Sequence, residues 1–377
     1  MFDDPVGDGV PAHPRKDVMD HQGLLIDLVS IDTTSRVAAA QRRVMDICIS
    51  EVRRTRPALH VHGDLDGAHP WVLLTNDAHP QASRLLFACH VDTVPIGVSS
   101  DWQFDPLAGD VADGHILGRG SVDMKAGLVA ALATLADTSD DTPLALLLTS
   151  DEEVGSLGAE RAVPALSEHR FGAVIIPEAT SNAVHLGHRG AFWLQIMTRG
   201  VAAHGSTPHL GVNAIHKLLD VLQRARTELP TVFHPHLRHS TWNLGQLNGG
   251  AVPNVVPAAA SAVIDHRTVG DQEQLLHWWG SQPEIDELHT LIDLPAVWTP
   301  AETPWLETLP AAVSDEAVTY FTDGCYIAQA LPGVPIVVWG PGHPTAMHAI
   351  DERVAISDLE LAIQHFKSVA HSWDHDS

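Results

Sequence analysis

The stretch Leu85-Leu-Phe-Ala-Cys89-His90-Val91-Asp92 joins a run of apolar residues to an imidazole and a carboxylate. Residues 85–89 have the composition of a strand buried on both faces, and packing preference alone would not end that strand in His-Val-Asp. In an extended chain, residues two apart share a face, so His90 and Asp92 can point together. The imidazole could then bind a metal ion while the carboxylate orients its other nitrogen. For this motif alone, a strand end with a solvated Asp is the alternative.

Two further apolar runs end in acids. Residues 144–148 are followed by Asp151-Glu152-Glu153, and Val174-Ile-Ile-Pro177 is followed by Glu178. Three consecutive carboxylates repel one another unless cations compensate them, and a metal ion is the natural cation. Adjacent carboxylates also point in different directions, so one can bind metal while the other acts as a general base on an activated water. The spacing does not say which does which, and a solvated acidic loop is the alternative.

The apolar runs alternate with segments of helical periodicity, which predicts an α/β fold. We expect a mixed, mainly parallel sheet with helices on both faces. Sheets of this kind place their chemistry beyond the carboxyl ends of the strands, so the polar residues above should meet at one edge. The expected strands are 71–74, 85–89, 144–148 and 173–176, and the expected helices include 24–29, 42–52, 126–135 and 158–166.

The pattern changes near Gly187 to an α+β type and returns to the first type after about Trp298. We therefore predict a catalytic domain in two parts, 18–186 and 298–377, with an α+β domain inserted at 187–297. Residues 1 to about 17 are rich in Asp, Gly and Pro, and we expect them to form a loose arm. The later expected strands are 192–198, 261–266, one near Leu288, and 334–339, and the later expected helices are 211–229, 272–280 and 325–331.

Composition excludes several classes of protein. Lys and Arg total 22 against 47 Asp and Glu, and the net charge of −25 argues against a nucleic-acid partner. The three cysteines, Cys48, Cys89 and Cys325, show no CxxC spacing and fit a reducing cytoplasm. No run of about 18 apolar residues and no export signal is present, so we expect no membrane partner and a cytoplasmic location.

Two more candidate ligands complete a metal site. Asp123 follows a Gly-rich turn and precedes an expected helix, where an Asp is ordinarily an N-cap. His348 lies in the loop after residues 334–339. Taken as a set, the candidates give two sites of one His and one private carboxylate each, sharing a bridging carboxylate. This oxygen and nitrogen set suits Zn²⁺, with Co²⁺ or Mn²⁺ possible. The set is His90, Asp123, Glu153, Glu178 and His348.

Three motifs occur in a fixed order: His90-Val-Asp92-Thr-Val-Pro95, Gly118-Arg-Gly-Ser-Val-Asp123-Met-Lys125 and Asp151-Glu-Glu-Val-Gly155. On these motifs the chain resembles the family of acetylornithine deacetylase, succinyl-diaminopimelate desuccinylase, aminoacylase and glutamate carboxypeptidase, which are co-catalytic zinc amidohydrolases. The resemblance extends from Ile31 to His348 and implies two Zn²⁺ per subunit. In the roles it implies, Asp123 bridges, His90 and Glu178 complete one site, Glu153 and His348 complete the other, Glu152 is the general base, and Asp92 orients His90.

The resemblance also implies that the inserted segment is a lid that pairs two subunits of a homodimer. Gly200-Val-Ala-Ala-His204-Gly-Ser-Thr-Pro208 is similar to the lid histidine motif, in which His204 would polarise the scissile carbonyl, commonly in the partner's active site. Asn254 and Arg267 match lid positions that hold the substrate's α-carboxylate, although a turn Asn and a strand-end Arg are the alternative. One departure is Pro177-Glu178-Ala, where many relatives have Gly-Glu-Pro; only the local backbone geometry is in doubt.

For the substrate, Leu186-Gly-His-Arg189-Gly and the Gly340-Pro-Gly342 loop look most similar to acetylornithine deacetylase, an enzyme of arginine biosynthesis. We therefore expect hydrolysis of the amide bond of an N-acyl amino acid. The alternatives within the family are a dipeptidase or carboxypeptidase, and a desuccinylase. From another class, the chain could be a catalytically silent metal-binding regulatory homologue, but every metal-site and base position is filled, which argues against that.

Overall fold

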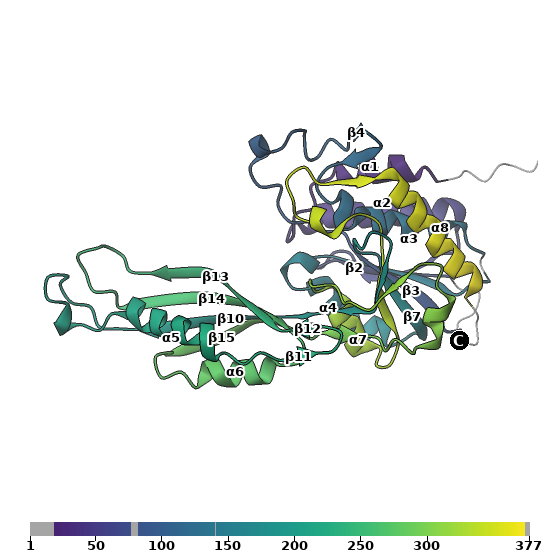
Figure 1. The fold of residues 1–377 in the computed structure, drawn as a ribbon. Helices are drawn as coiled ribbons and strands as arrows, with labels where there is room; N and C mark the ends of the chain where they lie inside the picture. Colours follow the sequence, from purple (N-terminus) through teal and green to yellow (C-terminus); the bar gives the residue numbers. More distant parts are fainter. Residues whose placement is uncertain (1–18, 77–81, 140, 374–377) are drawn as a thin grey trace, which may run out of the picture.

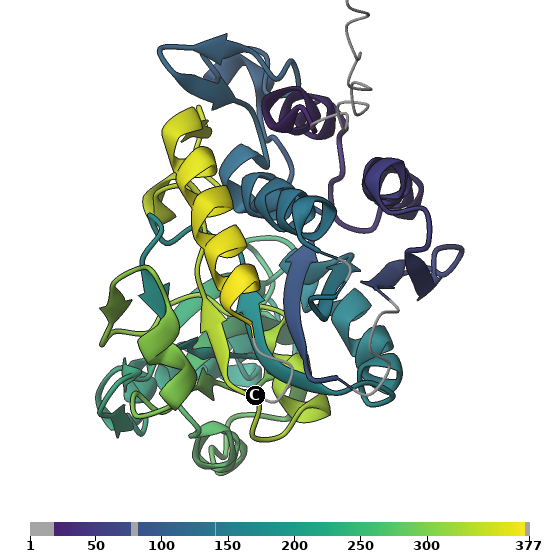
Figure 2. The same ribbon diagram turned by 90° about the vertical axis from the view of Figure 1, so that its right-hand side faces the viewer.

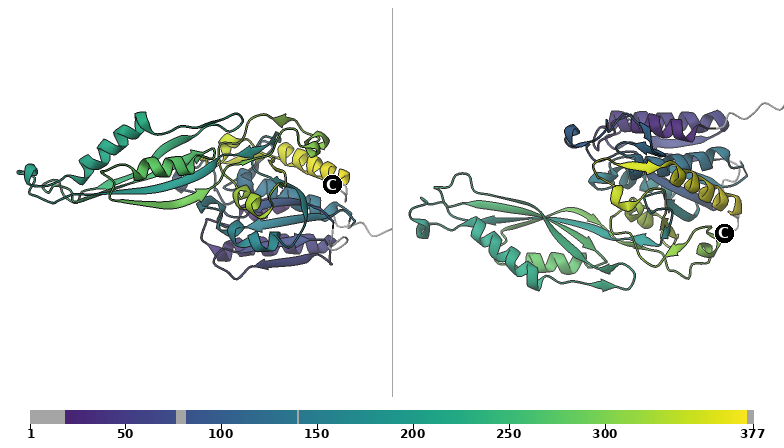
Figure 3. Two further views of the ribbon diagram at one scale, coloured as in Figure 1. Left: turned by 90° about the horizontal axis from the view of Figure 1, so that it is seen from below. Right: turned by 45° about the horizontal axis from the view of Figure 1, so that its top comes forward.

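The computed structural model describes residues 19–76, 82–139 and 141–373. It shows a layered α/β part and an elongated extension that leaves it on one side (Figure 1). Figure 3 shows the same elongated outline from two further directions. The arm expected at residues 1 to about 17 lies outside the described residues.

The α/β part is built on an eight-stranded sheet of order β1-β2-β6-β3-β7-β18-β8-β17. The neighbours from β6 to β18 run parallel, while β1 and β2 are antiparallel at one side and β8 is antiparallel to β18. The prediction of a mixed, mainly parallel sheet is thus confirmed. The strands are β1 (His60–Asp64), β2 (Trp71–Thr75), β3 (Arg84–His90), β6 (Leu144–Thr149), β7 (Phe171–Ile176), β8 (Val184–His185), β17 (Val313–Ser314) and β18 (Ile336–Val338).

Helices cover both faces of this sheet, as the alternating pattern predicts. On one face α1, α2 and α8 pack around α3, and Figure 2 shows these purple, blue and yellow helices together. On the other face α4 packs against α7 (Figure 1). The helices are α1 (His21–Val29), α2 (Ala38–Thr55), α3 (Ala126–Asp137), α4 (Leu157–Leu166), α7 (Gly324–Ala330) and α8 (Ile356–Ser372).

The register of the central strands brings their carboxyl ends level. All residues of β3 and β6 are buried, which their unbroken apolar composition requires. His90 lies opposite Thr149, and Phe87 lies opposite Ile175 of the strand on the other side. The loops after β3, β6 and β7 therefore leave the sheet at the same edge, which places polar residues from three separate segments beside one another.

The extension is an antiparallel sheet of order β13-β14-β10-β15 with α5 and α6 packed on it. It has a hydrophobic cluster of its own, which includes Leu194, Ile264, Leu218 and Trp279. Alternate residues of β10 and β14 are buried, as expected for strands with one covered face. The elements are β10 (Gly190–Arg199), α5 (Ala214–Glu228), β13 (Thr241–Gly249), β14 (Ala259–Thr268), α6 (Gln272–Gly280) and β15 (Glu287–Leu294).

Short strands complete the fold. One three-stranded sheet has the order β19-β5-β4, and two pairs are β11-β12 and β16-β9. Within the part of the chain that the structure describes, no helix is both long and apolar enough to span a bilayer. The short strands are β4 (Val111–Ala112), β5 (His115–Leu117), β9 (Gly187–His188), β11 (Phe233–His234), β12 (Arg238–His239), β16 (Val297–Trp298) and β19 (Arg353–Ala355).

A buried imidazole makes the stability of the extension depend on pH. His266 is 1% exposed, and its Nε2 accepts a hydrogen bond from Trp279 Nε1 at 3.0 Å. Burial lowers the pKa of His266 from 6.5 to about 4. Because the unfolded chain binds this proton below about pH 6.5 and the folded chain does not until about pH 4, stability is lost as the pH falls between these values.

We therefore expect His266 to destabilise the fold by about 2 kcal/mol at pH 5 relative to pH 7. His266→Gln keeps an acceptor for Trp279 but cannot titrate. Urea unfolding of both proteins at pH 7 and pH 5 measures the effect. The difference in unfolding free energy between the two pH values should be about 2 kcal/mol smaller in the variant; equal differences would show that His266 does not titrate on unfolding.

Candidate metal centre

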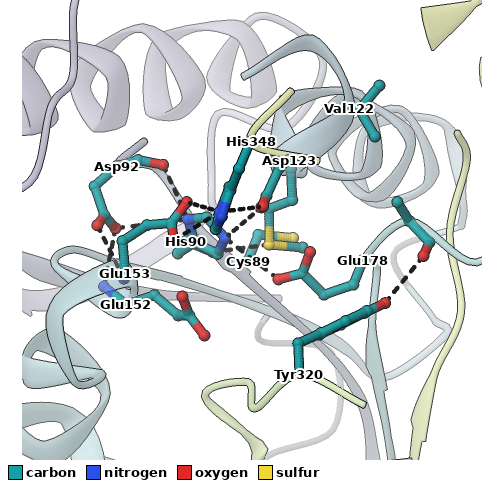
Figure 4. Close-up of polar contacts among 12 residues, drawn as sticks. Cys89, His90, Asp92, Val122, Asp123, Glu152, Glu153, Glu178, Tyr320 and His348 are labelled. Carbon is teal, nitrogen blue, oxygen red and sulfur yellow. Dashed lines mark hydrogen bonds and ion pairs between the residues drawn. The ribbon is translucent and has the colours of Figure 1, made fainter. Parts of the chain in front are cut away.

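Five side chains from five segments converge at the carboxyl edge of the central sheet (Figure 4). His90 is the last residue of β3, and Glu153 and Glu178 follow β6 and β7. Asp123 precedes α3, and His348 lies in the loop after β18. The parallel register of the strands explains why residues so far apart in the sequence lie together.

The five residues form two groups that share one carboxylate. His90 Nε2 lies 3.1 Å from Asp123 Oδ1 and 3.3 Å from Glu178 Oε1. His348 Nε2 lies 3.1 Å from Asp123 Oδ2 and 3.0 Å from Glu153 Oε2. In each group the candidate ligand atoms lie within 4.8 Å of one another. Asp123 thus offers one oxygen to each group, which is the arrangement of a bridging ligand.

The two groups differ in exposure. His90, Asp123 and Glu178 are all buried, whereas the His348 side chain is 49% exposed. The first group therefore lies deep in the edge of the sheet, and the second lies at its surface. A substrate that approaches from solvent meets the second group first.

Burial shifts the pKa values of the carboxylates in this centre. Burial raises the pKa of Glu178 to about 7, and the negative charge of Asp123 adds to the effect. Burial and Asp123 likewise raise the pKa of Glu153. Burial also opposes ionisation of Asp123, but its hydrogen bonds with His348 and His90 outweigh that effect and hold its pKa below the usual range.

The residues fit two divalent cations. The donor set is carboxylate oxygen and imidazole nitrogen, which Zn²⁺ accepts. Glu178 Oε2 is buried without a hydrogen-bond partner, so one carboxylate oxygen of the first group is free for a ligand. Four buried or nearly buried carboxylates, Asp123, Glu152, Glu153 and Glu178, face only two imidazoles, and two cations would balance that charge.

Asp92 joins the first group to the acidic segment. Its Oδ1 lies 3.5 Å from His90 Nδ1, but the nearer partner of that nitrogen is the backbone oxygen of Asp92, at 3.0 Å. The Asp92 carboxylate accepts hydrogen bonds from the backbone N–H groups of Glu152 and Glu153, at 3.0 and 3.3 Å. The Asp92 carboxylate therefore contacts both His90 and the acidic segment. The sequence does not predict the contact with the acidic segment.

The three consecutive acids have separate environments. Asp151 points away from the centre and accepts hydrogen bonds from Gln41 Nε2 at 2.9 Å and from the backbone N–H of Arg36, and it pairs with His69 Nδ1 at 2.6 Å. Glu153 joins the second group. Glu152 lies between Glu153 and Tyr320 in Figure 4 and belongs to neither group.

Glu152 is a buried carboxylate that belongs to neither ligand group. Its side chain is 5% exposed, and burial raises its pKa well above the usual value. The nearby charge of His90 opposes this shift, and that of Glu153 adds to it. A carboxylate with a raised pKa holds a proton more readily near neutral pH, which suits a general base that must also return the proton.

Comparison with known proteins agrees with this geometry. The model of the peptidase family M20/M25/M40 matches residues 86–372, about three quarters of the chain. The chain belongs to this family. The resemblance drawn from the motifs is confirmed, and the protein is a hydrolytic enzyme.

Named relatives in the M20 family act on different amides. The chain is 29% identical to a succinyl-diaminopimelate desuccinylase from Rhodospirillum centenum, over 76% of this chain and 80% of that protein. It is 30% identical to an acetylornithine deacetylase from Edwardsiella ictaluri, over 73% and 76%. Its fold matches that of an M20 family metallo-carboxypeptidase from Sulfolobus solfataricus with a TM-score of 0.78, at 16% identity, over 93% and 98% of the two chains.

The backbone around Asp123 differs from the prediction. The expected helix begins at Ala126, as α3, with Lys125 at its N-cap position, while Asp123 has a non-helical φ of −117° and ψ of 96°. Asp123 lies two residues before this N-cap position, so it does not cap α3. Met124 turns back toward β3, where its sulfur accepts a hydrogen bond from the His90 N–H at 3.2 Å. The turn before it needs a glycine at 120, since φ there is +82° and a Cβ would lie 2.7 Å from Thr93.

The structure separates the expected lid residues. His204 and Asn254 both follow the outer ends of strands, and Gly205 N donates to Asn254 O at 2.8 Å. We call this outer end of the extension its tip, and the end next to the α/β part its base. The ten residues of β10 run from base to tip, about 30 Å in an extended strand (Figure 1). Arg267 lies at the base instead, opposite Ala191 and over the ring of Phe321 at 5.7 Å. One copy of the chain therefore cannot bring Asn254 and Arg267 together in this conformation.

Two residues near the centre were not predicted. Tyr320 donates a hydrogen bond to the backbone oxygen of Ala179 at 2.9 Å, which lays its ring beside Glu178 (Figure 4). It lies in a loop without periodicity, so no sequence signal points to it. Glu352 accepts hydrogen bonds from the loop that carries Asp123. Its signal is its place four residues after His348 in a short acidic pair.

Proposed function

We propose that this M20 enzyme hydrolyses the amide bond of an N-acyl amino acid with two Zn²⁺ ions and Glu152 as general base. The arrangement of two His and carboxylate groups around Asp123, with Glu152 beside them and outside both, carries the proposal. His90, Asp123 and Glu178 would hold one ion, and Asp123, Glu153 and His348 the other. Co²⁺ or Mn²⁺ could replace Zn²⁺ in this donor set.

When bound, the metal ions supply Lewis acidity that acidifies a water and polarises the amide carbonyl. Glu152 takes a proton from the attacking water and delivers it to the leaving amine. The Asp92 carboxylate accepts a hydrogen bond from the backbone N–H of Glu152, which keeps Glu152 in place, and it orients His90. The ring of Tyr320 and the buried strand ends exclude bulk water on the inner side of the centre, which strengthens these interactions.

We infer that the remaining contacts to the substrate need two copies of the chain. His204 would polarise the scissile carbonyl and Asn254 would hold the α-carboxylate, both from the partner's extension, while Arg267 acts from the base of its own. The distance between tip and base in one copy supports this arrangement. A homodimer formed through the extensions would bring the tip of one copy to the centre of the other, and the predicted insert 187–297 would then act as lid and dimerisation domain.

For the substrate we propose an N-acetylornithine-like amide. The 30% identity to an acetylornithine deacetylase supports it, and the 29% identity to a succinyl-diaminopimelate desuccinylase supports desuccinylation as a second candidate. The fold shared with a metallo-carboxypeptidase keeps a peptidase as a third.

Amine release by the zinc-loaded protein distinguishes these candidates. The panel is N-acetylornithine, N-acetylcitrulline, N-acetylmethionine, N-succinyl-diaminopimelate and several dipeptides. Turnover concentrated on one N-acetyl amino acid would support the proposal and name the substrate. Turnover of dipeptides or of the succinyl compound would move the protein to those branches. Two bound ions without any turnover would favour a catalytically silent homologue.

Removal of metal should also lower stability. Zn²⁺ at 100 times its Kd stabilises the folded state by about 2.7 kcal/mol for each site that only the folded chain forms. Thermal unfolding followed by circular dichroism, with chelator and then with added Zn²⁺, should show a rise in Tm with zinc. Asp123→Ala removes the ligand common to both groups and should show little rise. An equal rise in the variant would place the zinc elsewhere.

A further inference from the structure

Glu352 links two of the three loops that supply the second group of candidate ligands, those of Asp123 and His348. Its carboxylate is buried at 1% exposure. Oε1 accepts hydrogen bonds from the backbone N–H groups of Val122 and Asp123, at 2.9 and 3.2 Å. Oε2 accepts one from Arg119 Nη1 at 2.6 Å. All three donors belong to the segment that ends in the shared carboxylate.

A small sheet brings these loops together. β19 begins directly after Glu352 and pairs with β5, where Arg353 lies opposite Leu117. The backbone adds one more bond, from Gly118 N to Glu352 O at 2.9 Å. The segment 118–123 is thus held by both the backbone and the side chain of a residue far away in the sequence.

Arg119 makes this contact specific for a carboxylate. Its side chain is 4% exposed, and its guanidinium lies 5.1 Å from the centre of the Trp102 ring. A buried guanidinium requires a negative partner, and Glu352 is that partner. With one oxygen taken by Arg119, the other is fixed toward the two backbone N–H groups, so the position of Asp123 depends on the pair.

The two groups depend on Glu352 to different degrees. Asp123 and His348 both lie on segments that Glu352 holds, since His348 is in the same loop four residues earlier. They are two of the three candidate ligands of the second group. The first group has one such ligand, Asp123, while His90 and Glu178 are fixed by β3 and β7.

We propose that Glu352 is a positioning residue that aligns Asp123 and His348 for the more exposed of the two metal ions. The inference rests on the proposed two-metal site. Loss of a residue that orients metal ligands typically lowers metal affinity 10- to 100-fold. We expect this loss for the second ion in Glu352→Gln. The carboxylate has one oxygen for Arg119 and one for the backbone N–H groups, whereas the amide has a single accepting oxygen. The first ion should lose much less.

Titration of metal-free protein with Zn²⁺, in competition with a chromogenic chelator, measures both affinities without any substrate. Asp351→Asn is the matched control. Asp351 ties the same loop to Gln103 through bonds of 2.8 and 2.7 Å but contacts neither Asp123 nor Arg119 in the structure. The control should bind both ions as the wild type does. A purely structural role would weaken both ions alike and lower Tm, and that result would overturn the proposal, as would unchanged affinities.

A double variant covers the case in which Glu352→Gln fails to fold. In Arg119→Met/Glu352→Gln the buried cation is gone, and the amide oxygen can accept from Val122 and Asp123 again. The second-ion affinity should return close to the wild-type value. A double variant that folds but still lacks the second ion would contradict positioning through these backbone bonds. Fewer than two ions on the wild type would refute the two-metal site itself, and the inference with it.

Discussion

Glu152→Ala should lower kcat by roughly 10²- to 10⁴-fold and leave two metal ions bound. Glu152 belongs to neither ligand group, so its removal takes away the proton acceptor but no candidate ligand. Metal content by atomic emission and amine release on the same preparation measure both quantities. Burying a charged carboxylate at position 152 costs folding free energy, so the variant should fold at least as well as the wild type.

Glu153→Ala is the control for this result. The two acids are adjacent, but Glu153 lies 3.0 Å from His348 Nε2 and is a candidate ligand. Its removal should reduce the metal content as well as the rate. If Glu152→Ala lost metal and Glu153→Ala did not, the two roles would have to be exchanged. Full activity in Glu152→Ala would remove the general base from the account.

Mixing two inactive variants should restore activity if the tip of one copy serves the centre of the other. His204→Ala and Glu152→Ala should each retain very little activity alone. In a mixed dimer, the centre with an intact Glu152 receives an intact His204 from its partner. Random pairing makes half of the dimers mixed, each with one working centre, so we expect about one quarter of the wild-type activity.

The subunits must exchange for this test, so the two variants are unfolded together and refolded as a mixture. The same mixture kept at a concentration too low for dimers should remain inactive. Activity of His204→Ala alone would show that His204 is dispensable. A mixture that stays inactive while dimers form would show that His204 acts within its own chain.

The parts of the fold that the sequence predicts best are those in which one physical requirement decides the pattern. Residues 85–89 and 144–148 are apolar without interruption because both faces of β3 and β6 are covered. Parallel pairing then places whatever follows them at one edge, so the convergence of His90 and the acidic segment could be predicted. By contrast, β13 was missed because it is an exposed edge strand with little apolar patterning.

The candidate site was predicted in composition better than in detail. Asp151, Glu152 and Glu153 carry the same chemistry in sequence, and only the turn after β6 aims them in different directions. Likewise, the spacing of Asn254 and Arg267 does not show that β14 separates them along its length. The role of Glu352 could not be predicted, because its partners, Arg119 and the backbone N–H groups of Val122 and Asp123, lie more than 200 residues away in the sequence.

The proposed amide hydrolysis requires two metal ions at the centre and Glu152 as general base. The most direct test is amine release during stepwise addition of Zn²⁺ to metal-free protein, with N-acetylornithine and the other panel substrates. We expect no turnover without zinc and a rate that reaches its plateau at two equivalents of zinc per chain. Turnover by the metal-free protein, or a rate that does not change as zinc is added, would contradict this proposal.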